Sequence, residues 1–139
     1  MLCHYCTSPR GLEAVLATNN VGYYPTVCTE ATAAFSVVSD TFKALQAEIL
    51  MRDDGKEYEK LIRNLQKHEQ LKLQYTAALH LEQIRLHQVD EQDATKPLLQ
   101  QSVAALQCKL AACVNDINEA LDEIQCSLVD AANDDGTAN

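Results

Sequence analysis

The feature that most constrains this chain is an uninterrupted run of helix-forming residues over positions 56–86. The run contains neither Gly nor Pro and is rich in Leu, Lys, Glu, Gln and Ala. These residues lose little conformational freedom on entering a helix. We therefore predict one long helix here, around which the other segments must be arranged.

The two halves of this helix carry different apolar patterns. The first half has one apolar stripe, formed by Tyr58, Leu61, Ile62 and Leu65. The second half has one apolar stripe that contains Leu71, Tyr75, Ala78, Leu79 and Leu86. A second apolar stripe lies on another face of the same half and is formed by Leu73, Ala77, Leu81 and Ile84. A helix that is apolar on two sides needs two neighbours. The second stripe is therefore our candidate surface for packing a partner helix.

Helical patterns flank the long helix on both sides. Before the long helix, apolar residues recur at heptad spacing, namely Cys28, Ala31, Phe35, Val38, Phe42, Leu45 and Ile49. After it, a second such set consists of Leu99, Val103, Leu106, Leu110, Val114, Ile117, Leu121, Ile124 and Leu128. The first of these helices should end near residue 52, and Gly55 is expected to take a left-handed cap in a tight turn. A link this short makes neighbouring helices antiparallel.

The expected fold is all-α: an elongated antiparallel three-helix bundle or coiled coil with a short extra N-terminal helix. Ser8 and Pro9 should start that short helix, and residues 23–25 should form an extended turn because Pro25 disfavours the α conformation before it. We divide the chain into an N-terminal segment (1–24), a long-helix domain (25–132) and a disordered acidic tail (133–139). The long helices would be roughly 42 to 54 Å long.

Charge and composition exclude several classes of protein. The chain has 11 basic and 20 acidic residues, and its net charge is −9. Such a surface repels a phosphate backbone, so we expect no direct nucleic-acid binding. No apolar run suggests a signal peptide or a membrane span. We expect a soluble intracellular protein with reduced cysteines.

The chain offers little that resembles a catalytic or metal site. Cys3 and Cys6 form a Cys-x-x-Cys pair without a second pair to complete a zinc tetrahedron. Incidental thiols are the simpler interpretation, although a small zinc or redox protein stays an alternative. The three histidines of the long helix, His68, His80 and His87, show no ligand spacing. We expect packing roles for the three cysteines of the last helix, Cys108, Cys113 and Cys126. We expect no catalytic residue, no metal and no cofactor.

Four cations at spacings of four, three and four form a basic ridge on the long helix: Lys56, Lys60, Arg63 and Lys67. One interpretation is internal pairing, because an antiparallel last helix would bring acidic residues alongside, namely Asp116, Glu119, Asp122 and Glu123. The other is docking of an acidic partner surface, such as that of tubulin.

Residues of the long helix resemble a known family. Leu65, Gln66, Glu69 and Leu73 form a Leu-Gln-x-x-Glu-x-x-x-Leu core, which Thr76-Ala77-Ala78-Leu79 follows. With a Thr-x-x-Phe setting at positions 32–35 and an amphipathic helix over 117–128, this pattern resembles the required-for-excision B-domain family of small eukaryotic proteins. The similarity covers residues 23–131, and the first 20 residues depart from it. The resemblance implies an accessory role in DNA excision repair.

Two functional settings follow from these observations. We expect a non-catalytic helical scaffold or adaptor subunit of a larger intracellular assembly, and the family resemblance implies DNA repair in the nucleus. The alternative is a structural subunit of a cytoskeletal assembly, such as a ciliary or axonemal complex on microtubules. The basic ridge would serve either setting as a surface for protein partners.

Overall fold

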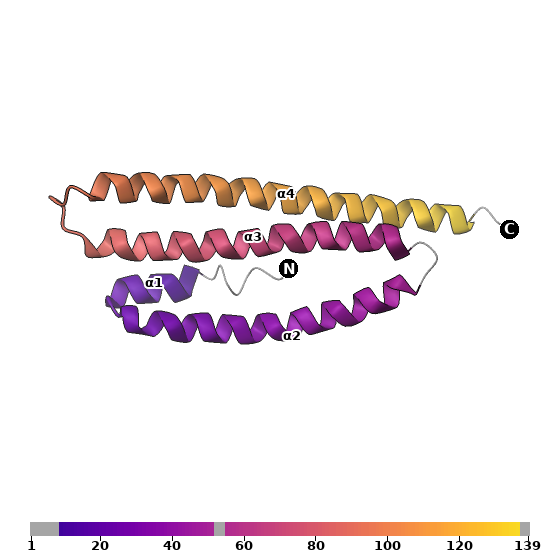
Figure 1. Cartoon of the computed structure of the whole chain (residues 1–139), viewed down its shortest axis with the longest axis horizontal. Coiled ribbons are helices and arrows are strands. Elements are labelled where there is room, and N and C mark those ends of the chain that lie inside the picture. The colour runs from indigo at the N-terminus through magenta and orange to yellow at the C-terminus, as the bar shows by residue number, and fades with distance from the viewer. Residues whose placement is uncertain (1–8, 52–54, 137–139) are drawn as a thin grey trace.

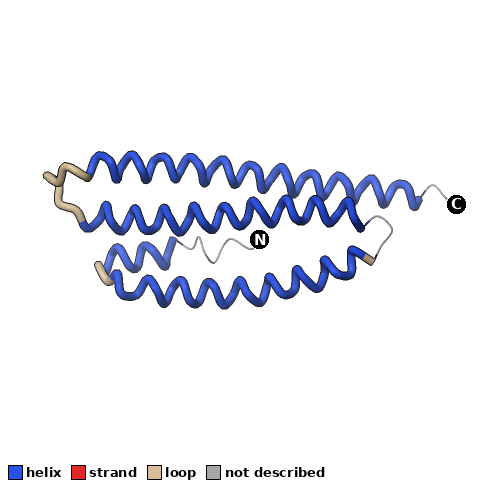
Figure 2. Tube along the Cα trace, in the orientation of Figure 1, coloured by secondary structure: helices blue, strands red, loops and turns tan. Residues whose placement is uncertain are grey.

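A computed structural model describes residues 9–51 and 55–136, and these residues are helical apart from short connections (Figure 2). The elements are α1 (Pro9–Thr18), the short 3-10 helix η1 (Val21–Tyr23), α2 (Tyr24–Leu50), α3 (Gly55–Gln88) and α4 (Lys96–Gly136). The all-α prediction is confirmed. α4 continues to Gly136, beyond residue 132, where the apolar pattern fades.

α3 is the central element of an elongated, flat layer of helices (Figure 1). α4 runs antiparallel to it on one side along most of its length, whereas α1 and α2 lie on the other side. The contact between α2 and α3 is much less extensive than that between α3 and α4. α2 and α4 therefore lie on opposite sides of α3, so the layer differs from a closed bundle in which each helix touches the other two.

The contact between α3 and α4 combines an apolar stripe with hydrogen bonds. Cys113, Ile117 and Ala120 of α4 are buried, at spacings of four and three that place them on one face. The Tyr58 hydroxyl donates to the Ser127 carbonyl at 3.1 Å, and the Cys113 thiol donates to the His68 carbonyl at 3.1 Å. Full burial of one large aliphatic side chain stabilises a fold by about 1.5 to 3 kcal/mol. This stripe therefore makes α3 and α4 the firmest pair of the layer.

The short helix α1 lies between α2 and α3 at one end of the layer (Figure 1). Leu12 and Val15 of α1 form a buried cluster with Ile84 of α3. Leu16, Val21 and Tyr24 pack against this cluster from its edge. One end of the second apolar stripe on α3 is therefore covered by a helix of the same chain.

Two turn predictions differ from the structure. Residues 23–25 are helical instead of extended, because η1 leads directly into α2 and Tyr24 is held against the α1 cluster. Gly55 is not a left-handed cap: it is the buried first residue of α3, and none of the described glycines has positive φ. A Cβ at position 55 would collide with the carbonyl oxygen of Ile49. The close approach of two helix ends thus requires Gly here.

The heptad seam of α2 is present as a helix face, but no other helix covers it fully. Val38, Phe42 and Ile49 are half-buried, whereas Cys28 is exposed and Leu45 is 49% exposed. In α4, by contrast, the apolar pattern is half-buried or buried from Leu99 to Ile117, and its exposed members are Leu121 and Leu128. α2 therefore keeps exposed apolar side chains along its seam.

Candidate partner-binding site

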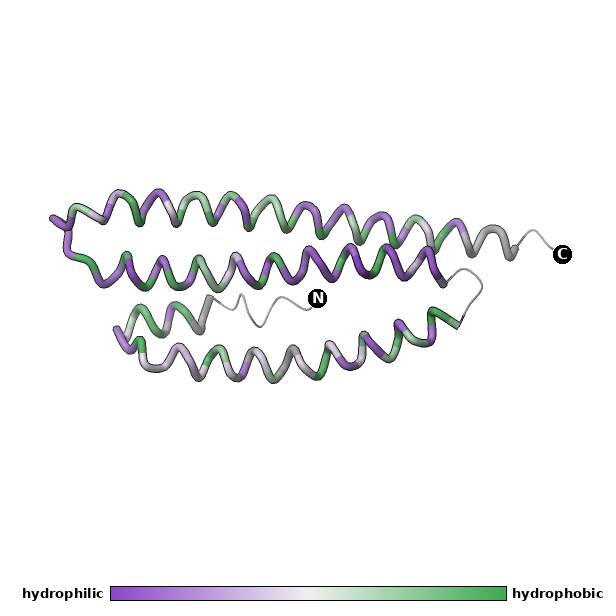
Figure 3. Tube along the Cα trace, viewed as in Figure 1, coloured by the Kyte–Doolittle hydropathy of each residue, from purple (hydrophilic) through white to green (hydrophobic). Residues whose placement is uncertain are grey.

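The basic ridge lies on the N-terminal half of α3, where hydrophilic and hydrophobic residues alternate (Figure 3). Lys56, Lys60 and Lys67 are exposed, and in the described part of the chain none of them has an ion-pair partner within 4.0 Å. Arg63 pairs with Glu59 of its own helix, its Nε lying 2.7 Å from Oε1. Three of the four cations are therefore free to meet another molecule.

The expected pairing between the ridge and α4 is absent from the described residues. No ridge cation forms an ion pair with the four acidic residues of α4 that were expected to pair with it, namely Asp116, Glu119, Asp122 and Glu123. Among the described residues, Asp116 of α4 approaches α3 at His68, where the distance from His68 Nδ1 to Asp116 Oδ2 is 3.6 Å and is too long for a hydrogen bond. The prediction of internal pairing is wrong because the α4 contact uses a different face of α3.

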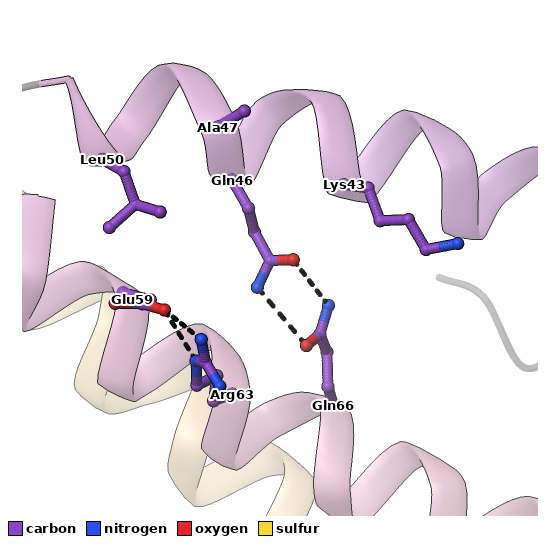
Figure 4. A pocket seen from close by; sticks show the side chains of 7 residues that line it. All are labelled: Lys43, Gln46, Ala47, Leu50, Glu59, Arg63 and Gln66. Carbon is purple, nitrogen blue, oxygen red and sulfur yellow. Dashed lines mark hydrogen bonds and ion pairs between the residues drawn. The ribbon is translucent and has the colours of Figure 1, made fainter.

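A pocket of about 380 Å³ borders the ridge between the C-terminal half of α2 and the N-terminal half of α3 (Figure 4). We call it the α2–α3 groove, and its lining residues are Lys43, Gln46, Ala47, Leu50, Glu59, Arg63 and Gln66. Gln46 and Gln66 reach across it and exchange two hydrogen bonds of 3.4 Å each. Arg63 belongs both to the groove and to the ridge, so the two features form one surface.

The α2–α3 groove is polar at its centre and apolar at one end. Lys43 pairs with Asp40 of its own helix at 3.3 Å, and both side chains remain about 70% exposed. Leu50 is 48% exposed, and the adjacent Met51 is 89% exposed. This surface holds no nucleophile beside a base. Cations, amides and exposed apolar groups suit recognition of a partner by charge and contact.

The second apolar stripe of α3 is divided between two environments. Ile84 is buried beneath α1, with 6% of its surface exposed. Leu73 is half-buried, Ala77 is exposed, and Leu81 is 50% exposed. The part of the stripe beyond α1 thus remains open to a partner.

The cysteines of the last helix differ in their surroundings. Cys113 is buried in the α3–α4 contact, and this burial raises the pKa of its thiol, with a further rise from the carboxylates of Asp116 and Glu69. Cys108 and Cys126 are exposed, so the prediction that they pack is wrong. Their positions flank the apolar stripe of α4 and are not part of it. Cys3 and Cys6 lie outside the described residues.

Two of the histidines that the structure describes, His68 and His80, are half-buried. The His80 Nδ1 atom and the Tyr24 hydroxyl are hydrogen-bonded at 3.2 Å, and burial lowers the pKa of His80. His87 is exposed at the end of α3. Over residues 9–51 and 55–136, no group of three or more His, Cys, Asp and Glu side chains is placed to hold a metal ion.

The sequence contained one unused signal for the α2–α3 groove. Lys43, Gln46, Ala47 and Leu50 recur at helical spacing beside the heptad seam, and they form a second face of α2 that is polar in its first half and apolar in its second. The polar part of such a face is usually solvated, so the pattern alone did not identify a contact between helices.

No described helix is both long and apolar enough to cross a membrane.

Comparison with known proteins gives one family and no individual relative. The model of the family described as DNA repair REX1-B matches residues 3–83, which is more than half of the chain. The match begins 20 residues earlier than the similarity expected from the sequence and stops before α4. It therefore includes the N-terminal residues that were expected to depart from the family. Neither a curated protein nor a solved structure matches the chain.

Proposed function

We propose, from the premise that the chain belongs to the DNA repair REX1-B family, that it is a non-catalytic helical scaffold or adaptor subunit of a larger assembly in DNA repair. The observation that carries the proposal is the surface formed by the basic ridge and the α2–α3 groove. Lys56, Lys60 and Lys67 lie on it, exposed and without an ion-pair partner among the described residues. Exposed cations beside exposed apolar groups are typical of a protein-binding surface.

The open architecture supports a role in assembly. α3 contacts α2 much less extensively than it contacts α4. A helix from a partner, laid against α2 and α3, would complete a closed packing of three helices. The net charge of −9 argues against a role in which this chain itself grips DNA. It would instead connect protein subunits.

The test is fractionation of the tagged chain from nuclear extract under mild conditions, with co-eluting subunits identified by mass. We expect the chain to elute in a complex much larger than its own 15.4 kDa, together with proteins of DNA repair. A Lys60→Glu, Lys67→Glu variant should leave that complex. Elution of the wild-type chain alone, at its own size, would refute the scaffold role.

A cytoskeletal role is the second candidate, and the elongated shape with its exposed cations favours it. Microtubule surfaces are acidic, so the basic ridge would meet an opposite charge there. Co-sedimentation of the purified chain with microtubules tests this directly. The Lys60→Glu, Lys67→Glu variant should then stay in the supernatant, whereas equal pelleting of both proteins would exclude a role for the ridge.

A further inference from the structure

We propose that the α2–α3 groove docks an acidic amphipathic helix of a partner protein. This inference rests on the proposed scaffold function and adds the site and the chemistry of the partner. Three features of the groove support it: the sign of its charge, the position of its apolar groups and the weakness of the contact that now spans it.

The charge of this region is opposite to that of the rest of the chain. Residues 56–67 hold four cations and two carboxylates, whereas the whole chain has a net charge of −9. Lys60 and Lys67 lie three residues before and four residues after Arg63, so they continue its row along the rim of the groove. Glu59 already neutralises Arg63. The uncompensated charge comes from the lysines, and an acidic partner would complement it.

The apolar groups lie on the opposite rim, at helical spacing on α2. Ala47 and Leu50 line the groove, and Met51 follows at the end of the helix with 89% of its surface exposed. A wholly acidic peptide would leave these groups in water. A helix with one apolar stripe and flanking carboxylates would cover them and meet the lysines at the same time.

The contact across the groove is one that a partner can replace. The two Gln46–Gln66 hydrogen bonds are 3.4 Å long and exposed, so water competes with both. The α3 rim from Lys56 to Lys67 extends for about 16 Å at 1.5 Å per residue, which equals about three helical turns. A partner helix of this length therefore has a lysine near each of its turns.

A nucleic acid fits the same surface less well. Its phosphates would meet the lysines but also the carboxylates of Glu57 and Glu59, which stand on the same stretch of α3. Leu50 and Met51 would gain nothing from a phosphate backbone. An acidic helix accounts for the cations and the apolar rim together, so nucleic acid becomes an outcome of the test.

The test is an NMR titration of the isotope-labelled full-length chain, which at 15.4 kDa is suited to this method. The probe is a synthetic helix of about 18 residues, with Leu along one face and Glu on its flanks. A matched peptide with Lys in place of Glu and a short DNA duplex serve as controls. We expect amide shifts over residues 43–51 and 56–67 with the acidic peptide, and weaker binding at higher salt.

Three variants make the assignment specific. Ala47 is exposed, so Ala47→Glu should leave the fold intact while it blocks the groove and repels the peptide. Lys60→Glu should weaken binding about fivefold to tenfold. Lys109→Glu changes the charge equally on the exposed surface of α4, and it should change the affinity less than twofold. Circular dichroism of each variant confirms that its helices form.

Four results would overturn the inference: shifts confined to other helices, no binding, equal binding of the lysine peptide, or tighter binding of DNA at the same residues. Failure here is distinct from failure of the scaffold role. If the chain still elutes with repair proteins but the peptide does not bind the groove, only the docking site is wrong. If the peptide binds and the chain elutes alone, the scaffold role fails.

Discussion

Replacing Ile84 with Ala should detach α1 from the layer. Ile84 is 6% exposed and packs against Leu12 and Val15. The substitution removes three carbon atoms, each contributing about 0.8 kcal/mol when buried, which gives about 2.4 kcal/mol. The cavity left behind adds to this cost, so we expect a loss of about 3 kcal/mol in the free energy of unfolding, within the range of about 2 to 5 kcal/mol typical of such changes.

Leu81→Ala is the matched control, because it removes the same number of carbon atoms less than one turn earlier on α3. Leu81 is 50% exposed, so only about half of the transfer free energy is lost, roughly 1.2 kcal/mol, and no closed cavity forms. The difference between the two variants, about 2 kcal/mol, measures what α1 contributes by covering Ile84.

Urea unfolding followed by circular dichroism gives the two free energies, and hydrogen exchange locates the effect. α1 has only 10 residues, fewer than the about 12 to 15 that an isolated helix needs to be even marginally stable. Its amides should therefore exchange about 100-fold faster in Ile84→Ala, while those in the middle of α4 change much less. Equal free energies for the two variants, or unchanged protection of α1, would refute the reasoning.

Three further predictions concern single side chains of the layer. Thr76 Oγ1 is buried without a hydrogen bond, so Thr76→Val should raise the free energy of unfolding by about 1 kcal/mol, and a lower melting temperature would show that the hydroxyl has a partner. Cys113 should react with a thiol reagent much more slowly than Cys108, because burial raises its thiol pKa; equal rates in peptide mapping would contradict this. Burial lowers the pKa of His80 below 6.5, so the unfolded state binds more protons than the folded one in acid. The contribution of the neutral His80 to stability is therefore complete above pH 6.5 and is lost as the pH drops below it, and His80→Gln should reduce this loss in urea titrations at pH 7.5 and 5.5.

The helices themselves were predictable from the sequence because their signals are local. The absence of Gly and Pro over residues 56–86 and the heptad spacing on either side fix three long helices to within a few residues. Pro9 and the residues after Thr18 likewise bound α1. The two apolar stripes of α3 indicated neighbours on both sides, and α4 and α1 occupy those positions.

The arrangement of the helices was less predictable because it depends on which faces meet. The heptad seam of α2 indicates a helix but does not specify its partner, and this seam stays half-covered. Gly55 looks in the sequence like a residue of a tight turn. In the structure Gly is required there because the Ile49 carbonyl approaches its Cα closely, and no local sequence pattern reveals such an approach. The spacing of the four ridge cations also does not show that Arg63 is paired with Glu59 of its own helix, and this pairing neutralises one of the four charges.

The contacts of α3 with α4 and with α2 differ in kind, and this difference determines where a partner could act. The α3–α4 contact buries Ile117 and Ala120, so opening it would expose apolar surface to water at a cost of several kcal/mol. Between α1 and the helix ends where Gly55 meets Ile49, the α2–α3 contact includes the Gln46–Gln66 pair, whose exposed amides exchange for water at little cost. A partner helix can therefore separate or bridge α2 and α3 without disturbing α4, and the α1 cluster would keep α2 attached at its other end.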